Sequence, residues 1–271
     1  MRVGIVADPS SAGATEVIAA ADRLGVDGVL IRQGSTELDG FVIAASLSRH
    51  GGVGLVVVEI EVGGHPIHLA EKAAVADQVL AGRLAVILRG SDRETLIESA
   101  NTVSSALRAR PFSTGRGRWP SPASIETDDV SWSAIRVTPT PNQLRLPIFV
   151  GGPAGRDAAL AAGIPYFADV EDGAGVLGEH WDQMTSRYSM AADQMTRAGI
   201  RHTNGFDESS AQALVRDRGH WGAELVFLQR EATAPWDRAS VAGLASRLKP
   251  RVSLDDLPVG LEEFWDATIQ T

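Results

Sequence analysis

The regular alternation of short apolar runs with longer segments of helical period is the feature that most constrains the fold of this 271-residue chain. Short runs rich in β-branched residues are typical of buried parallel strands. Eight such runs are predicted, at Val3–Ala7, Gly28–Arg32, Val53–Glu59, Leu84–Arg89, Ile148–Gly151, Tyr166–Val170, Ile200–Thr203 and Glu224–Gln229. Strands that are separated by helical segments indicate βα units around a parallel sheet.

Each predicted strand is followed by a segment with apolar residues near positions i, i+3, i+4 and i+7, the pattern of an amphipathic helix. These predicted helices are Ala14–Leu24, Leu38–Arg49, Pro66–Leu80, Asp92–Arg108, Arg156–Ala162, His180–Arg197, Ser209–His220 and Ser240–Leu248. Eight βα units in a chain of this length favour an α/β fold of the (β/α)8 TIM barrel type, with residues 1–271 as a single domain. A doubly wound sheet is the rival, but Ala7–Gly13 lacks the G-x-G-x-x-G turn that normally follows its first strand.

One interval between predicted strands is much longer than the others. It contains Ala109–Leu146, which is rich in Pro, Ser, Thr and Gly. We interpret this segment as an insertion between the fourth helix and the fifth strand that passes over the barrel mouth. A structureless connection of that length is uncommon in a compact domain, so we expect structure of its own, with a plausible hairpin in Ser124–Thr127 and Ser133–Val137, or a lid function.

Composition excludes several classes of function. The chain has 25 Lys+Arg against 34 Asp+Glu, a formal net charge of −9, which disfavours binding to nucleic acid or to an anionic membrane. The absence of cysteine excludes disulfides, zinc–thiolate sites, iron–sulfur clusters and a thiol nucleophile. No apolar run is long enough to span a bilayer, and Met1–Asp8 is typical of a strand rather than of a signal peptide. We therefore expect a cytoplasmic protein without a nucleic-acid or membrane partner.

The end of the fifth predicted strand is the first candidate for a binding site. Active sites of TIM barrels form at the carboxyl ends of the strands. Here Gly151 and Gly152 end a buried strand, and Gly155 follows just before an Ala-rich helix. Glycines allow close approach to the backbone, and the free N–H groups of a helix start favour an anion such as phosphate. A tight βα turn that requires glycine only for its conformation is an equal alternative.

The fourth predicted strand ends beside the same place. Arg89, Gly90 and Ser91 supply a guanidinium group, a point of close approach and a hydroxyl group. The ends of two adjacent strands are therefore expected to converge on an anion. Taken alone, Arg89 would more commonly form a salt bridge on the barrel rim.

Two further patterns have simple structural alternatives. Glu59 and Glu61 share one face of the third strand and could form a paired-carboxylate acid–base site, although solvated rim carboxylates are commoner. His65, His68 and Glu71 have helical spacing that could suggest a metal site. The Pro66 that follows His65 suits the first position of a helix instead, so we expect no metal.

Several segments, in order along nearly the whole chain, resemble the bacterial luciferase-like flavin-dependent monooxygenases. Gly64–Leu84 resembles the family's "HP…LAE…A..D.LS.GR" run into the fourth strand. Val137–Gly152 resembles its "P.P.Q.P.PI.IGG" stretch. Gly222–Gln229, with Leu248–Pro250 beyond, resembles its last strand and helix.

The resemblance implies a (β/α)8 barrel with an insertion near the fifth strand, and a homodimer. It also implies a flavin-dependent oxidoreductase of the luciferase-like monooxygenase type that acts on a small organic substrate. Reduced FMN, or alternatively a deazaflavin, would bind at the barrel mouth, and a flavin reductase is an expected partner. The family positions that contact the cofactor phosphate match Arg89 and Ser91, with Gly90 between them, and its phosphate loop matches Gly151, Gly152 and Gly155.

The chain also departs from the family pattern. Many members have a catalytic His at the end of the second strand, whereas Leu30–Gly34 contains none. The family's "GLGxG" after the fourth strand is replaced by Val86–Gly90, and Glu59 and Glu61 stand where small or apolar residues are usual. No residue is singled out as catalytic. A non-catalytic flavin-binding or scaffold relative is therefore the alternative, and an unrelated phosphate-handling isomerase or aldolase barrel is a weaker one, because strand-end lysines are scarce.

Overall fold

The computed structural model describes residues 2–7, 14–24, 26–32, 39–49, 54–108, 136–188, 196–203 and 208–230, together with positions 236, 238, 239, 241 and 242. The strands are β1 (Arg2–Ala7), β2 (Gly28–Arg32), β3 (Leu55–Glu61), β4 (Leu84–Arg89), β5 (Ile148–Gly151), β6 (Phe167–Ala168), β7 (Ala198–Thr203) and β8 (Leu225–Arg230). They form one eight-stranded sheet in the order β5-β4-β3-β2-β1-β8-β7-β6.

The sheet curls into a barrel that is nearly closed. Every pair of neighbouring strands is parallel. At the seam, β5 meets β6 through a single parallel bridge between Val150 and Tyr166, and the Val150 amide donates to the carbonyl of Pro165 at 2.9 Å. The predicted (β/α)8 barrel is therefore confirmed.

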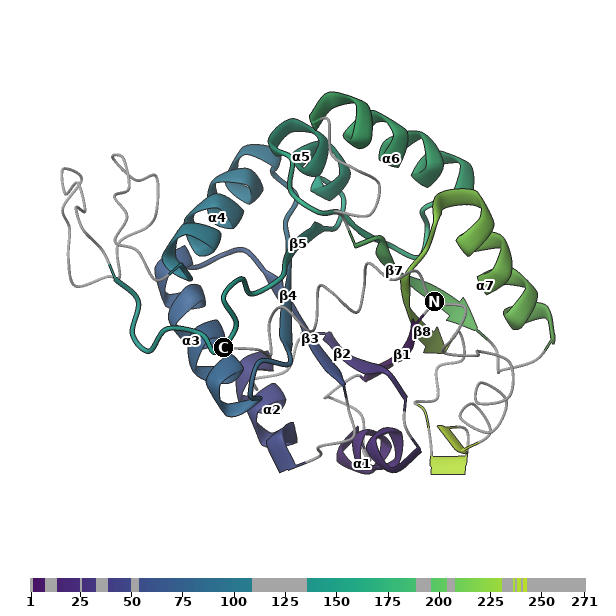
Figure 1. The fold of residues 1–271 in the computed structure, drawn as a ribbon, viewed down its shortest axis with the longest axis horizontal. Helices are drawn as coiled ribbons and strands as arrows, with labels where there is room; N and C mark the ends of the chain where they lie inside the picture. The colour runs from purple at the N-terminus through teal and green to yellow at the C-terminus, as the bar shows by residue number, and fades with distance from the viewer. Residues whose placement is uncertain are drawn as a thin grey trace.

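Helices follow the strands and surround the barrel (Figure 1). They are α1 (Ala14–Leu24), α2 (Gly40–Ser46) with a 3-10 turn at Leu47–Arg49, α3 (Pro66–Val79), α4 (Arg93–Ala106), α5 (Gly155–Ala162), α6 (Ala174–Tyr188) and α7 (Glu208–Trp221). No helix within the described ranges is both long enough and apolar enough to cross a membrane.

Several predicted elements differ at their ends from the observed ones, and the differences at β6 and α6 bear on the candidate site. Strand β6 has two residues instead of the predicted Tyr166–Val170, because the backbone N–H of Asp169 donates to the Asp172 side chain and not to a neighbouring strand. Helix α6 begins at Ala174, six residues before the predicted start at His180.

Three predictions fall wholly or mostly outside the described residues. The helix at Ser240–Leu248 is one, and the hairpin at Ser124–Thr127 and Ser133–Val137 is another. Of the predicted insertion Ala109–Leu146, the structure describes residues 136–146, which contain neither helix nor strand. A single domain over the whole chain therefore stays a prediction.

The inside of the barrel is filled by side chains that alternate along each strand. A buried apolar cluster inside the barrel includes Leu30, Val57, Ile87, Phe149 and Phe227. Because strand side chains repeat with a period of two, the next inward positions toward the carboxyl ends of β2, β3 and β4 are Arg32, Glu59 and Arg89. The apolar cluster therefore lies directly beneath a layer of polar side chains at the barrel mouth.

A buried carboxylate holds the segment before β5 against the barrel. Asp77 of α3 is 0% exposed and accepts hydrogen bonds from the backbone N–H of Leu84 (3.4 Å), the backbone N–H of Gln143 (2.9 Å) and Gln143 Nε2 (2.7 Å). Gln143 Nε2 also donates to the Leu84 carbonyl at 2.7 Å. This group of contacts fixes the entry to β5, whose carboxyl end carries the predicted glycines.

Candidate functional site: a polar layer at the barrel mouth

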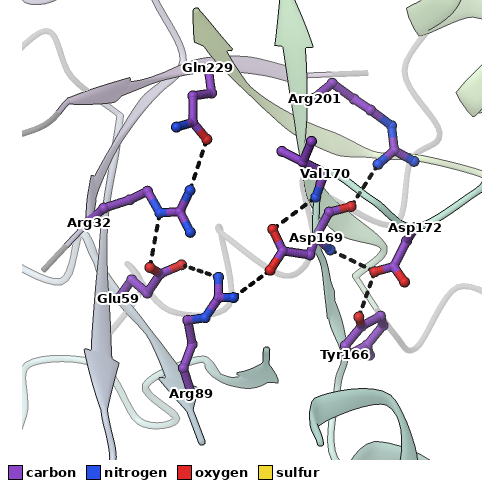
Figure 2. Close-up of polar contacts among 9 residues, drawn as sticks. All are labelled: Arg32, Glu59, Arg89, Tyr166, Asp169, Val170, Asp172, Arg201 and Gln229. Atoms are coloured by element: carbon purple, nitrogen blue, oxygen red, sulfur yellow. Dashed lines mark hydrogen bonds and ion pairs between the residues drawn. The ribbon is translucent and has the colours of Figure 1, made fainter. Parts of the chain in front are cut away.

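Side chains from five strands or strand ends form a connected polar layer at the barrel mouth (Figure 2). Arg32 ends β2 and lies directly opposite Glu59 of β3 in the sheet register. Arg89 ends β4, and Asp169 follows β6. Gln229 of β8 reaches the layer from the far side of β1.

Glu59 lies between the two arginines. Arg32 Nε donates to Glu59 Oε1 at 3.0 Å, and Arg89 Nη1 donates to Glu59 Oε2 at 3.1 Å. Only 6% of Glu59 is exposed, so the interpretation of a solvated rim carboxylate is wrong for this residue. Its neighbour on the same face, Glu61, is exposed.

The layer continues from both arginines across the barrel. Arg89 Nη2 donates to Asp169 Oδ2 at 2.5 Å, and Arg32 Nη1 donates to Gln229 Oε1 at 2.9 Å. The two guanidinium groups therefore match the two carboxylates in charge. Burial acts to lower the pKa of Arg89, but Glu59 and Asp169 outweigh it and raise the pKa above its usual value, so Arg89 stays charged.

The predicted residues after β4 and β5 come together at one side of this layer. Arg89 lies opposite Gly151 in the register. Gly152 has a φ of +78°, and a Cβ there would lie 3.3 Å from Arg89 Nε and 3.6 Å from the backbone nitrogen of Gly90. The expected convergence of the two strand ends is therefore observed, while contact with a phosphate stays a prediction. Arg89 also forms salt bridges, with Glu59 and Asp169, as was expected for an arginine on the barrel rim.

The remaining predicted positions have different surroundings. A Cβ on Gly155 would lie 3.1 Å from Cε2 of Tyr166, so glycine allows the start of α5 to pack on that ring. The residue before it, Ala154, gives α5 no side-chain cap, which leaves the first backbone N–H groups without a capping side chain. Ser91 is exposed and directly precedes Asp92, whose carboxylate caps α4 by accepting from the Thr95 N–H at 2.7 Å.

The histidine pattern on α3 has the structural role that was expected for it. His65 is the N-cap residue, accepting from the Ile67 N–H at 3.3 Å, and Pro66 follows as the first helical residue. His68 is exposed and pairs with Glu71 at 3.1 Å. In the part of the chain that the structure describes, no group of three or more metal-ligating side chains occurs.

Asp169 falls inside the predicted strand Tyr166–Val170, and no site role was predicted for it or for Tyr166, Asp172 and His180. The Tyr166 hydroxyl donates to Asp172 Oδ2 at 2.6 Å, and the same oxygen accepts from the Asp169 N–H at 2.7 Å. His180 of α6 lies edge-to-face with the Tyr166 ring, at 5.3 Å between centroids. The alternation of side chains along the predicted strand could have placed Asp169 inside the barrel. No sequence pattern predicts its contact with Asp172 or the contacts of Tyr166.

The buried ring of His180 gives the fold a pH dependence. His180 is 3% exposed, and burial together with the nearby Arg156 lowers its pKa to about 4, against opposing effects of Asp172 and Asp157. The unfolded chain takes up the proton near the ordinary pKa of about 6.5. Stability from this residue is therefore complete above pH 6.5 and is lost as the pH falls toward 4.

We expect His180→Phe to reduce the acid sensitivity of the protein. Between pH 7 and pH 4.5 the wild type should lose about 2–3 kcal/mol more unfolding free energy than the variant. Urea denaturation of both proteins at the two pH values measures this difference. An equal loss in both proteins would show that His180 does not resist protonation in the folded state.

No protein-family model matches this sequence. Among solved structures, the monooxygenase RslO1 from Streptomyces bottropensis superimposes with a TM-score of 0.68 at 17% identity, covering 93% of this chain and 100% of that one. The oxygenating constituent of 3,6-diketocamphane monooxygenase from Pseudomonas putida, in complex with FMN, gives 0.61 at 14% identity, covering 94% and 99%. Coenzyme F420 dependent tetrahydromethanopterin reductase from Methanopyrus kandleri gives 0.65 at 11% identity, covering 93% and 99%. The chain thus has the barrel fold of these proteins, the fold that the resemblance to the luciferase-like family implied.

Proposed function

We propose that this protein is a flavin-dependent oxidoreductase of the luciferase-like type that binds reduced FMN or a deazaflavin at the barrel mouth and acts on a small organic substrate. The observation that carries the proposal is the juxtaposition of Arg89 and Gly152 beside the start of α5, which has no side-chain cap. Structural neighbours that are FMN-bound or F420-dependent support the cofactor class.

The residues at this place fit the phosphate end of such a cofactor. Gly152 has a positive φ of +78°, and a Cβ there would lie 3.3 Å from Arg89 Nε, so glycine keeps this place free of a side chain. The Gly155 N–H donates to the Gly152 carbonyl at 2.9 Å, and the N–H groups that follow it in α5 have no capping side chain and are donors for an anion. Arg89 already donates to Glu59 and Asp169, while its Nε lies on the Gly152 side. The bound cofactor would supply the redox chemistry, and the barrel would anchor it and line its surroundings.

A titration with three cofactors tests this function. Purified protein is mixed with FMN, with reduced FMN under anaerobic conditions, and with a deazaflavin, and binding is followed by fluorescence. We expect saturable binding of at least one of them. Absence of binding to all three would reject the proposal.

A non-catalytic flavin-binding or scaffold relative is the second candidate. The observation that favours it is that the charged side chains of the polar layer pair with one another. The guanidinium groups of Arg32 and of Arg89 each form an ion pair with Glu59. Turnover of reduced flavin or NAD(P)H with oxygen and a panel of aldehydes, sulfonates and ketones distinguishes the two. Substrate-dependent turnover supports the oxidoreductase, whereas flavin binding without turnover supports the scaffold.

Arg89→Ala should weaken FMN binding by about 1.5–3 kcal/mol, or about 10- to 150-fold, because it removes a charge-assisted hydrogen bond to the phosphate. Riboflavin, which lacks the phosphate, is the matched ligand and should bind both proteins equally. Lys should rescue only in part, since it keeps the charge and loses the planar fork. Stability should also fall, because Asp169 loses its guanidinium partner. A folded variant with wild-type FMN affinity would show that Arg89 is only structural.

We also propose that the protein is a homodimer that uses the α2–α3 face. Within the described residues, four of the five exposed large hydrophobic side chains belong to α2, to α3 or to the segment that Gln143 bonds to α3: Val42 (65%), Val75 (47%), Val79 (46%) and Leu144 (67%). Lys72 of α3 forms an ion pair with Asp39, the N-cap residue of α2, and His68 hydrogen-bonds Glu71. An apolar face is the surface that a second copy with the same net charge of −9 approaches at least electrostatic cost.

Replacing both Val75 and Val79 by Glu should weaken this dimer by about 100-fold or more, because unpaired carboxylates would be buried at the contact. Light scattering coupled to size-exclusion chromatography measures the change. Val176→Glu is the matched control, because Val176 is also exposed (44%) but lies on α6. A monomeric wild type, or an equal effect of the control, would contradict the assignment.

A further inference from the structure

A single carboxylate behind the barrel mouth connects the two sides of the proposed phosphate site. Asp172 Oδ2 accepts one hydrogen bond from the Tyr166 hydroxyl at 2.6 Å and one from the Asp169 backbone N–H at 2.7 Å. Tyr166 directly precedes β6 and Asp169 directly follows it. The Asp172 side chain therefore spans the whole of this two-residue strand.

On one side, this contact holds Asp169 in the orientation that reaches Arg89. The Asp169 N–H is bound by Asp172, and its carbonyl accepts from Arg201 Nη1 at 3.0 Å. Its Oδ1 accepts from the Val170 N–H at 2.9 Å, which leaves Oδ2 for Arg89 (Figure 2). With both backbone groups and Oδ1 bonded, the Asp169 carboxylate presents Oδ2 to Arg89.

On the other side, the contact holds the ring on which α5 begins. Tyr166 is 2% exposed, and its Cε2 would be 3.1 Å from a Cβ at Gly155. Burial and the hydrogen bond to Asp172 raise the pKa of Tyr166 far above its usual value, so the hydroxyl remains a donor. The position of the Tyr166 ring therefore determines where Gly155 and the N–H groups that follow it lie relative to the barrel mouth.

Strand β6 has fewer backbone contacts to its neighbours than the other described strands. Strand β6 has two residues and pairs with β7 through two register positions, and its link to β5 is the Val150–Tyr166 bridge. Within the described chain, all other neighbouring strands share four or more register positions. The seam therefore has few backbone hydrogen bonds to fix the mouth on this side.

We infer that Asp172 is a positioning residue for cofactor phosphate binding, acting through Tyr166 on the start of α5 and through Asp169 on Arg89. The inference rests on the proposed function, in which the phosphate binds between Arg89 and α5. Asp172 itself touches neither Arg89 nor the glycines in the contacts described. Its effect is to fix the distance between the two halves of the site.

The test uses Asp172→Asn and Tyr166→Phe, with Tyr188→Phe as the matched control. The Tyr188 hydroxyl donates to the Leu160 carbonyl at 2.8 Å, and its ring packs on Gly163, so it supports the opposite end of the same helix. Each Tyr→Phe change removes one hydrogen bond of similar length near α5. FMN and riboflavin affinities and hydrogen exchange of the cofactor-free backbone at residues 152–157 are measured for all variants.

We expect FMN affinity to fall about five- to tenfold in Asp172→Asn and Tyr166→Phe, with riboflavin affinity and the Tyr188→Phe control unchanged. Amide exchange at residues 152–157 should accelerate in the same two variants and not in the control. Wild-type exchange and FMN affinity in both variants would overturn the positioning role while leaving the proposed function intact. If the wild type binds FMN no better than riboflavin, the phosphate site itself is wrong and the role falls with it.

Discussion

Glu59→Gln is expected to destabilise the fold by about 3 kcal/mol or more, because it removes the carboxylate between two guanidinium groups inside the barrel. Glu59 is 6% exposed, and both its oxygens accept from arginines. The amide keeps the size of the side chain but leaves Arg32 and Arg89 as neighbouring positive charges. Arg89 keeps the Asp169 carboxylate as a partner, whereas Arg32 keeps only the neutral Gln229 among its described contacts, so the loss falls mainly on Arg32.

Urea denaturation of the wild type and of this variant measures the loss. Glu61→Gln is the control, because Glu61 is on the same face of β3 and is exposed, so its effect should stay within about 0.5 kcal/mol. Equal stability of wild type and Glu59→Gln would mean that the polar layer is not held by this carboxylate.

Asp77→Ala is expected to cost about 4 kcal/mol of unfolding free energy. The change removes the acceptor for Leu84 N–H and for two donors of Gln143, and it leaves these groups buried without their partner. Asn has the same shape and keeps one oxygen, so Asp77→Asn should cost less. Thermal and urea unfolding measure both variants.

The neighbouring Gln78→Ala provides the comparison for Asp77. Gln78 also bonds the segment before β5, through the Thr140 carbonyl at 2.6 Å, but that contact is exposed. We expect a loss below about 1 kcal/mol for it. If Asp77→Ala lost as little unfolding free energy as Gln78→Ala, the segment before β5 would not depend on the buried carboxylate.

The strand pattern predicted the barrel, because burial on both faces of parallel strands leaves a strong apolar signal. The same signal placed Arg32, Glu59 and Arg89 at the carboxyl ends of their predicted strands, and the observed β3 runs two residues further, to Glu61. The pairing among them depends on the stagger between strands, which sequence alone does not determine. The contact from Arg89 to Asp169 joins residues 80 positions apart, so no local pattern could have predicted it.

The early start of α6 shows a different limit. Its first turns contain Gly175 and Gly178, and each glycine disfavours a helix by about 1 kcal/mol relative to alanine. Helical periodicity therefore becomes clear only further along the segment. The buried Leu177 packs this turn against the barrel and outweighs the low propensity.

A crystal structure of the protein with bound FMN or a deazaflavin tests the central claim most directly. The cofactor phosphate is expected within hydrogen-bonding distance of the Gly152 backbone and the first N–H groups of α5, with Arg89 as a further donor. A phosphate bound at other strand ends, with Arg89 still engaged only by Glu59 and Asp169, would contradict it.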